Sequence, residues 1–406
     1  MMKILFFTEN THCGGLDTFI SSLINRWPYP EDELSLICNE DHPGLKVIRE
    51  RLTRPCKIYG HQMPIYVQIA LRLQRVPLLH MIRKCFGPFL KYFFFLYNIF
   101  ALRPLLLKDR PDRLFVINGG YPAGDSCRAA VIAWKLFSQK REAVLNIHNL
   151  ASAPRWFEKI QENVLDYYLA RSSAKIVCVS KACADSFIHR RVLNRRNVPT
   201  FIYNGIIAKS GVSMTKEQAK ERFHIPPDAL LCSVLATYEP RKGHAFLLEA
   251  FQRIVRQFPQ AYLLLCGYGK ADEIEQVKNL VATSPVVRQI RMHGFLEDTS
   301  AVMAATDLLL IPSQSFESFG LVAVEAFAAR VPVVTTNVGG LIETVADGEG
   351  GYVIDWQDTD GFVQKVVMLL KNPALRREQG EKGYQRYKKI FTADRMAQEY
   401  AALVRN

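Results

Sequence analysis

Short apolar runs alternate along the chain with glycine-bearing turns and with segments of helical periodicity. Each run has the length of one buried strand, and apolar residues at spacings of three and four follow several of them. Strands that alternate with helices predict two parallel, doubly wound α/β sheets. The runs occupy residues 3–8, 34–38, 114–117, 143–147 and 176–179 in the first half, and residues 230–236, 261–266, 290–293, 308–311, 332–335 and 351–354 in the second.

The clearest strand–turn–helix unit lies at residues 308–328. The apolar run stops at Pro312, and a helix is expected to begin at about Gly320, with Glu317 before it and Glu325 two turns into it. A helix N-terminus favours anions through its N–H groups and its dipole, and carboxylates can bind hydroxyls. The pattern therefore fits a sugar nucleotide, although two solvated glutamates beside a buried helix would have the same spacing.

A second glycine turn follows closely. The run at 332–335 precedes Gly339-Gly340, and two adjacent strand ends with glycine turns form the crevice in which open α/β sheets bind ligands. Glu317, Glu325, the Pro332 strand and the Gly-Gly turn together resemble the donor-site signature of the family-4 retaining glycosyltransferases of the GT-B fold, also called glycosyl transferases group 1. The resemblance implies two Rossmann-like domains that face each other across a cleft, with a C-terminal helix returning to the first.

The predicted domains follow from this resemblance. We expect an N-terminal acceptor-side domain at 1–205, a C-terminal nucleotide-sugar-binding domain at 206–385, and a C-terminal helix at 386–406. A linker is expected from about 205 to 215.

Two features of the first half match family positions. Gly14 and Gly15 lie between a strand and a helix, as in any ordinary strand–helix turn, and His148 ends a strand, where a lone histidine is more often structural. The resemblance implies that Gly14 and Gly15 lie beside the donor phosphates. It also implies that His148 lies near the transferred sugar.

Lys242 follows a strand in the segment Pro240-Arg241-Lys242-Gly243-His244. A lysine in this turn can reach a diphosphate, or it can be an ordinary surface lysine. The resemblance implies the phosphate role. Many family members carry an arginine five or six residues earlier, where this chain has Thr237 and Ala236, and Arg241 is the candidate replacement.

The resemblance also implies a division of roles. Glu325 would bind the ribose hydroxyls, Glu317 would lie near the sugar hydroxyls, and Lys242 would neutralise the leaving diphosphate. We therefore expect His148, Lys242 and Glu317 to be catalytic. The expected donor-binding residues are Gly14, Gly15, Arg241, Lys242, Ser318, Phe319, Gly320, Leu321 and Glu325. Retention in this family is usually assigned to front-face attack without a metal. We expect no metal site and no cofactor, and a UDP- or GDP-linked donor.

The net positive charge of the chain comes entirely from its first half. The net charge is +13. Residues 1–205 hold 29 of the 52 basic and 16 of the 39 acidic residues, which leaves 23 of each in the remainder. Nucleic acid, an anionic membrane or an acidic substrate could each attract such a basic half. The chain shows no recognisable nucleic-acid-binding motif, so that partner is not expected.

Basic residues alternate with aromatic residues in the segment 61–110. Its uncharged stretch 92–102 is too short to span a bilayer, which needs about 20 apolar residues. We expect an interfacial helix on anionic lipid, although a buried helix with snorkelling basic side chains would give the same pattern. The expected lipid contacts are Arg72, Arg75, Arg83, Lys84 and Lys91.

The cysteine content and the first residues of the chain indicate the cellular compartment. Nine scattered cysteines without a Cys-x-x-Cys pair are typical of a reducing compartment, and residues 1–7 are too short for a signal peptide. We therefore expect a retaining glycosyltransferase, peripheral on the cytoplasmic membrane face, that acts on a glycan or lipid-linked acceptor in bacterial surface polysaccharide or lipopolysaccharide biosynthesis. The alternatives are a GT-B sugar-nucleotide epimerase and a non-catalytic sugar-nucleotide-binding protein. The sequence determines neither the sugar nor the oligomeric state.

Overall fold

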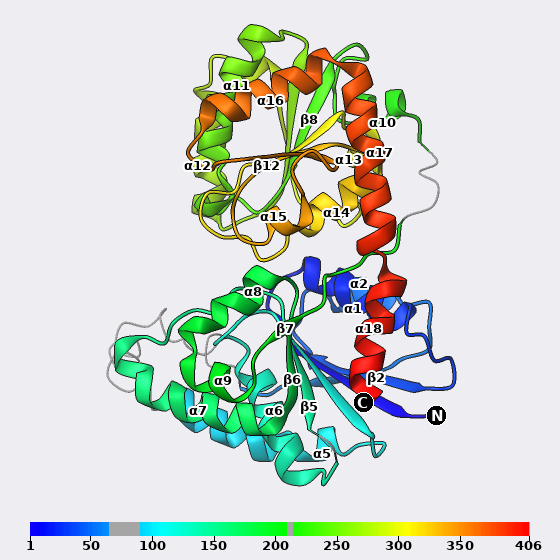
Figure 1. Cartoon of the computed structure of the whole chain (residues 1–406), viewed down its shortest axis with the longest axis vertical. Helices are drawn as coiled ribbons and strands as arrows, with labels where there is room; N and C mark the ends of the chain where they lie inside the picture. The colour runs from blue at the N-terminus through cyan, green and yellow to red at the C-terminus, as the bar shows by residue number, and fades with distance from the viewer. Residues whose placement is uncertain (65–89, 141, 209–213, 406) are drawn as a thin grey trace. The chain divides into compact units, whose positions relative to one another are not determined.

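The protein was analysed as a computed structural model that describes residues 1–64, 90–140, 142–208 and 214–405 (Figure 1). The chain divides into two compact units. Unit 1 contains Met1–Tyr203 and Ala393–Asn406, and unit 2 contains Asn204–Thr392.

Unit 1 is built on a parallel sheet with the strand order β3-β2-β1-β4-β5-β6-β7. The order reverses between β1 and β4, where Glu9 at the end of one strand pairs with Asn118 at the end of the other. Ligands bind beside such a switch point in doubly wound sheets, at the carboxyl ends of the strands. The strands are β1 (Lys3–Glu9), β2 (Glu33–Asn39), β3 (Lys57–His61), β4 (Arg113–Asn118), β5 (Ala143–Ile147), β6 (Ser173–Cys178) and β7 (Thr200–Phe201).

Helices cover both faces of this sheet (Figure 1). The C-terminal helix belongs to unit 1, because Tyr400 packs its ring against Phe19 of α1 and Phe115 of β4, with centroids 5.6 and 5.2 Å apart. The helices are α1 (Gly15–Asn25), α2 (Leu45–Arg51), a helix at 90–101, α5 (Arg103–Leu106), α6 (Asp125–Phe137), η1 (Trp156–Glu158), α7 (Lys159–Ser172), α8 (Lys181–Asp185), η2 (Ser186–His189), α9 (Arg191–Arg196) and α18 (Ala393–Arg405).

Unit 2 contains a second parallel sheet, with the strand order β10-β9-β8-β11-β12-β13. Cys232 and Val234 of β8 join the core beneath α11 (His244–Gln257) and α16 (Thr359–Lys371). Leu231 joins the core beneath α10 (Lys216–Arg222) and α13 (Ser300–Ala305) on the other face. Both faces are therefore buried, which explains why these strands are continuous apolar runs in the sequence. The strands are β8 (Leu230–Leu235), β9 (Ala261–Cys266), β10 (Ile290–His293), β11 (Leu308–Ile311), β12 (Val333–Thr336) and β13 (Gly351–Ile354).

Helices connect the successive strands of unit 2, and further helices precede its first strand and follow its last (Figure 1). They are α10 (Lys216–Arg222), η3 (Pro240–Lys242), α11 (His244–Gln257), α12 (Ala271–Ala282), η4 (Val287–Gln289), α13 (Ser300–Ala305), α14 (Leu321–Ala328), α15 (Leu341–Thr344), α16 (Thr359–Lys371) and α17 (Pro373–Ile390).

The predicted pair of doubly wound parallel sheets is confirmed. Two strands were not predicted, and both lie at edges of the unit 1 sheet. Strand β3 (Lys57–His61) includes a lysine, a glycine and a histidine, and β7 has only the two residues Thr200–Phe201, so no apolar run marks either strand. The units divide after Tyr203 and after Thr392, whereas the expected boundary at 385 lies inside α17.

Candidate active site

Two loops of unit 2 contact each other at the carboxyl ends of neighbouring strands. Lys242 ends η3, just after β8, and Glu317 lies in the loop after β11, the strand that pairs with β8. The ammonium group of Lys242 forms an ion pair with the Glu317 carboxylate, and each side chain is 16% exposed. Because both groups are largely shielded from water, their charges are screened less than those of a surface pair.

A glycine allows this close approach. Gly243 has a φ of 75°, and a Cβ atom there would overlap the carbonyl oxygen of Pro312. The backbone N–H of Gln314 donates to the carbonyl of Arg241 at 2.7 Å. The two loops are therefore joined by their backbones, and only glycine fits the crossing without strain.

Arg241 holds the same two loops through its guanidinium group. Its Nε and its second terminal nitrogen donate to the carboxylate of Glu239 at 2.6 and 3.2 Å. The other terminal nitrogen donates to the backbone carbonyl of Phe316 at 3.3 Å. The guanidinium group also lies 4.7 Å from the centre of the Phe316 ring. Burial raises the pKa of Glu239, but hydrogen bonds from Arg241 and Thr237 outweigh burial and lower it. Arg241 thus has a structural function, and its replacement of the family's arginine stays a prediction.

The helix after the Glu317 loop begins at a glycine. Gly320 is the N-cap of α14 with a φ of 86°, and a Cβ atom there would overlap the side chain of Leu341. Ser318 and Phe319 are buried, and the Phe319 ring packs against Phe391 with centroids 5.7 Å apart. The N-terminus of α14, at Leu321, therefore lies directly after a rigid turn, and its dipole favours an anion.

The Gly339-Gly340 turn supports the Glu317 loop. The N–H of Gly340 donates to the carbonyl of Glu317 at 2.8 Å, and a Cβ atom at either glycine would overlap the 317–318 backbone. The hydroxyl of Thr344 donates to the carbonyl of Phe319 at 2.5 Å. The turn after β12 and the turn after β11 are thus packed together.

Glu325 contacts a residue that the sequence did not single out. The hydroxyl of Thr299, just before α13, donates to Oε2 of Glu325 at 2.9 Å. A lone threonine 26 positions upstream gives no sequence signal of this contact.

In unit 1, the Gly14-Gly15 turn is organised by a buried aspartate. The N–H of Gly14 donates to Oδ2 of Asp17 at 2.9 Å, and Nε2 of His42 lies 2.8 Å from the other oxygen. Asp17 and His42 are both buried. Gly15 begins α1. The sequence did not single out this Asp17–His42 pair, because the two residues are 25 positions apart.

His148 follows β5 and is neutral at physiological pH. Burial lowers its pKa to about 3. Its Nε2 lies 2.6 Å from Oδ1 of Asn146, whose amide nitrogen donates to Val177 and Tyr400. The Nε2 atom must therefore donate, and Nδ1 is the acceptor nitrogen of this tautomer. The ring edge packs on Phe19 with centroids 4.3 Å apart.

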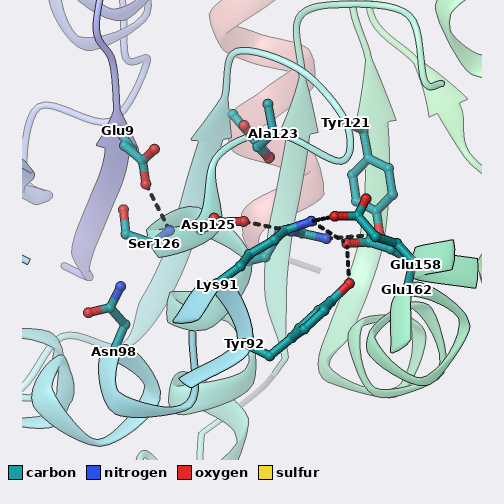
Figure 2. Close-up of polar contacts among 12 residues, drawn as sticks. Glu9, Lys91, Tyr92, Asn98, Tyr121, Ala123, Asp125, Ser126, Glu158 and Glu162 are labelled. Carbon is teal, nitrogen blue, oxygen red and sulfur yellow. Dashed lines mark hydrogen bonds and ion pairs between the residues drawn. The ribbon is translucent and has the colours of Figure 1, made fainter. Parts of the chain in front are cut away.

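Of the five expected lipid contacts, Arg72, Arg75, Arg83 and Lys84 lie outside the described residues. Lys91 lies in the helix at 90–101 and is 14% exposed. Its ammonium group pairs with Glu158 at 3.4 Å and with Glu162 at 3.1 Å (Figure 2). Lys91 thus forms an internal ion pair.

Within the described ranges, no helix has both the length and the apolar character needed to cross a membrane.

Glu162 belongs to a buried charge network. Its second oxygen accepts from Arg128 at 2.9 Å and from Arg190 at 2.7 Å. Arg128 also pairs with Asp125 at 2.6 Å, and Arg190 with Asp166 at 2.7 Å. Burial raises the pKa of Glu162, but the nearby positive charges outweigh burial and lower it to about 2. The acids of α7, Glu162 and Asp166, are therefore paired with buried arginines inside unit 1.

The expectation of no metal site rested in part on the absence of an Asp-x-Asp motif, and that interpretation was wrong, because Asp358-Thr359-Asp360 has the spacing that many metal-dependent transferases use. Here the first aspartate caps α16 by accepting from the N–H of Gly361 at 2.8 Å, and the second pairs with Arg253. Both carboxylates thus have structural partners.

Comparison with known proteins finds a family match over most of unit 2. Residues 215–386 match the family described as glycosyl transferases group 1, which confirms the resemblance to that group. The chain is 25% identical over 274 residues to N-acetyl-alpha-D-glucosaminyl L-malate synthase of Bacillus anthracis, covering 68% of this chain and 70% of that one. It is 29% identical over 185 residues to the lipopolysaccharide core biosynthesis glycosyltransferase LpsE of Rhizobium meliloti, covering 46% and 52%.

A shorter match is to phosphatidyl-myo-inositol mannosyltransferase of Mycolicibacterium smegmatis, with 34% identity over 141 residues. It covers 34% of this chain and 35% of the mannosyltransferase.

Solved structures confirm the fold. A glycosyltransferase from Rickettsia africae matches with a TM-score of 0.76 and 16% identity, covering 100% of this chain and 98% of that one. Anabaena HepE, solved in complex with UDP, matches with a TM-score of 0.74 and 18% identity over the full length of both chains. The predicted GT-B fold with two Rossmann-like domains is therefore confirmed.

Proposed function

We propose that the protein is a retaining, metal-independent glycosyltransferase that moves a sugar from a nucleotide-sugar donor to a glycan or lipid-linked acceptor. The observation that carries this proposal is the Lys242–Glu317 pair, which joins two strand-end loops beside the N-terminus of α14. The group 1 match covers this whole constellation.

The proposed donor roles follow from the chemistry of each side chain. The Lys242 ammonium has three donors and can retain Glu317 while also binding a diphosphate. The carboxylate of Glu317 can accept from the sugar hydroxyls, and that of Glu325 from the ribose. The backbone of Gly320 and Leu321 offers a helix N-terminus to the sugar or phosphate. Thr299 would fix the orientation of Glu325 by its hydrogen bond.

His148 would act as a neutral hydrogen-bonding group. With its pKa lowered by burial to about 3, the imidazole carries no positive charge at pH 7. In the tautomer set by Asn146, its Nδ1 can accept a hydrogen bond from a hydroxyl. Sugar orientation, rather than charge stabilisation, is therefore the role we propose.

The proposed reaction is front-face attack. The bond between the anomeric carbon and the diphosphate oxygen breaks while the acceptor hydroxyl oxygen bonds to the same face of that carbon. The acceptor proton passes to the departing diphosphate, so no protein base is required. The charge that develops on the leaving group is met by Lys242 and by the α14 dipole, both of which are held in place before the donor binds.

The acceptor and the location are proposed from the relatives. One relative is named for lipopolysaccharide core biosynthesis and another as a phosphatidyl-myo-inositol mannosyltransferase. Their names support a lipid-linked or surface-glycan acceptor, and we propose that the transfer takes place at the cytoplasmic membrane face of a bacterium. HepE was solved in complex with UDP and with UDP-glucose, which supports a uridine-linked donor as the first to test.

A donor screen tests the proposal. UDP-, GDP-, ADP- and dTDP-sugars are added separately to the protein in the presence of a chelator, and the melting temperature is measured. At least one nucleotide sugar should stabilise the folded state by mass action. If none does, the donor site is rejected, and if stabilisation requires a divalent ion, the metal-independent mechanism is rejected. Sugar inversion without transfer would identify an epimerase instead.

A further inference from the structure

The outer side of α7 in unit 1 exposes a set of large apolar side chains. Ile160, Val164 and Tyr168 recur at a spacing of four residues, so they lie on one face of the helix, and all three are exposed. Trp156 and Phe157 of η1 extend this face, and Trp156 is 87% exposed. Single exposed apolar residues are common, but a contiguous helical stripe indicates an interaction surface.

The helix at 90–101 has a second exposed stripe. Phe93, Leu96, Tyr97 and Phe100 occupy the spacing i, i+3, i+4, i+7 and are each more than half exposed. On the opposite side, Phe95 is buried. The helix therefore buries one apolar face in unit 1 and presents a second apolar face outward.

The internal ion pairs hold these two helices side by side. Lys91 and Tyr92 point from the helix at 90–101 toward Glu158 and Glu162, as Figure 2 shows. Inward-facing polar residues thus tie the two helices together, and their outward faces remain apolar. We call these outward faces together the apolar face.

The exposed charges of the segment 155–196, which contains η1 and α7, are almost all positive. Across residues 155–196, the exposed basic residues are Arg155, Lys159, Arg171, Lys175, Lys181, Arg191, Arg195 and Arg196, against one exposed acid, Asp185. The other acids of this segment, Glu158, Glu162 and Asp166, turn inward to Lys91, Arg128 and Arg190. Lys181 pairs with Asp185, so that acid is neutralised as well.

We infer that the apolar face is a membrane-docking surface of unit 1 that inserts into the headgroup region of an anionic bilayer. An exposed apolar stripe with a basic rim is the pattern of an interfacial element, with aromatic side chains at the acyl boundary and basic side chains on the phosphates. Trp156 lies between Arg155 and the exposed Lys159, so both kinds of contact are available at one point.

This inference deepens the membrane part of the proposed function. The sequence predicted the helix at 90–101 as part of the membrane segment 61–110, whereas it did not predict the contribution of η1 and α7 to this surface. The inference rests on the proposed function only for the purpose of the docking, which is to bring unit 1 to a lipid-linked acceptor. The docking itself requires neither donor nor acceptor.

Vesicle flotation of the full chain tests the inference. The wild-type protein is mixed with vesicles of phosphatidylcholine containing phosphatidylglycerol, and in parallel with phosphatidylcholine alone, at low and at high salt. It should float with the anionic vesicles at low salt and bind much less at high salt, because screening weakens the basic contacts. Binding to phosphatidylcholine alone should be weaker at both salt concentrations.

Two variants separate the apolar and basic contributions. Trp156→Ser with Ile160→Ser should lower the vesicle partition coefficient at least about tenfold, because both exposed side chains lose their apolar area. Arg155→Glu with Lys159→Glu should lower anionic-vesicle binding by about tenfold or more. The matched control is Trp356→Ser, since Trp356 is a partly exposed tryptophan of unit 2, and it should bind as the wild type does.

Tryptophan fluorescence gives an independent readout. Trp27 and Trp134 are buried, so in a Trp356→Phe background Trp156 is the exposed tryptophan. Its emission should shift to the blue on anionic vesicles and be quenched by brominated lipid. An unchanged spectrum overturns the inference, as does flotation of the Trp156/Ile160 double variant at the wild-type level.

Other results would overturn the inference without affecting the donor site. If wild-type protein stays unbound at low salt, the face is not a membrane surface. If it instead self-associates in sedimentation and the double variant is monomeric, the face belongs to a second copy of the chain. Nucleotide-sugar stabilisation, measured on the same samples, reports on the proposed function separately.

Discussion

The ammonium group of Lys242 forms an ion pair with the carboxylate of Glu317, which lies 75 positions further along the chain. The pair exists because β8 and β11 are neighbours in the sheet, so the loops that follow them meet. It places a positive and a negative group, each largely shielded from water, beside the start of α14.

The first prediction concerns Lys242. Lys242→Ala should lower kcat by about 100-fold or more, because the developing charge of the diphosphate loses a preorganised contact. Arg241→Ala is the neighbouring control, and it should chiefly lower stability, since its guanidinium group bonds Glu239 and Phe316. Steady-state kinetics and urea unfolding measure the two effects.

Full transfer activity in a folded Lys242→Ala protein would contradict the diphosphate role. If Arg241→Ala instead loses as much kcat as Lys242→Ala at unchanged stability, Arg241 does replace the arginine that is absent at 236 and 237.

The second prediction separates the two acids. Glu325→Ala should raise the Kd for the nucleotide, whereas Glu317→Ala should lower kcat or broaden sugar choice, because hydroxyl-binding sites discriminate strongly. Thr299→Val removes the 2.9 Å hydrogen bond to Glu325 and should weaken nucleotide binding in the same direction by a smaller factor. Calorimetric titration with UDP measures binding. Equal effects of both alanine variants on UDP affinity would disprove this division of roles.

The third prediction concerns Gly243 and stability. Gly243→Ala should lower the free energy of unfolding by about 2–4 kcal/mol, because φ is 75° and the added Cβ would overlap Pro312. Gly294→Ala is the matched control, since a Cβ there has open space around it and its φ lies outside the left-handed region. Its effect should be within about 1 kcal/mol of zero. Similar urea midpoints for the two variants would show that the two loops move apart at little cost to accommodate the added Cβ.

The fourth prediction concerns His148 and pH. Burial lowers the folded-state pKa to about 3, below the usual value near 6.5, so the unfolded chain binds the proton more readily. The stability linked to His148 is therefore complete above about pH 6.5 and is lost as the pH falls toward about 3. His148→Gln should reduce the loss of unfolding free energy between pH 7 and pH 5 by up to about 2 kcal/mol.

Urea unfolding of both proteins at the two pH values measures this difference. A variant whose stability falls as steeply as that of the wild type would show that His148 is protonated normally in the folded state. The same histidine should leave no inflection near pH 6.5 in kcat.

The sequence alone determined the elements whose signals are local. Buried parallel strands appear as continuous apolar runs, and the runs at 261–266, 290–293 and 308–311 coincide with β9, β10 and β11. Glycine turns at 320 and 339 were visible because a left-handed backbone restricts residue type at one position. The edge strand β3 was missed because an edge strand need not be apolar.

Only the tertiary structure decided which side chains meet. The pairing of Lys242 with Glu317, and of Thr299 with Glu325, depends on sheet order, which the spacing of residues in the chain does not encode. It also decided that Glu162 turns inward to Arg128 and Arg190 while α7 exposes its apolar side. Composition records the charge of a segment, but the face on which each charge lies is fixed by packing against residues far away in the sequence.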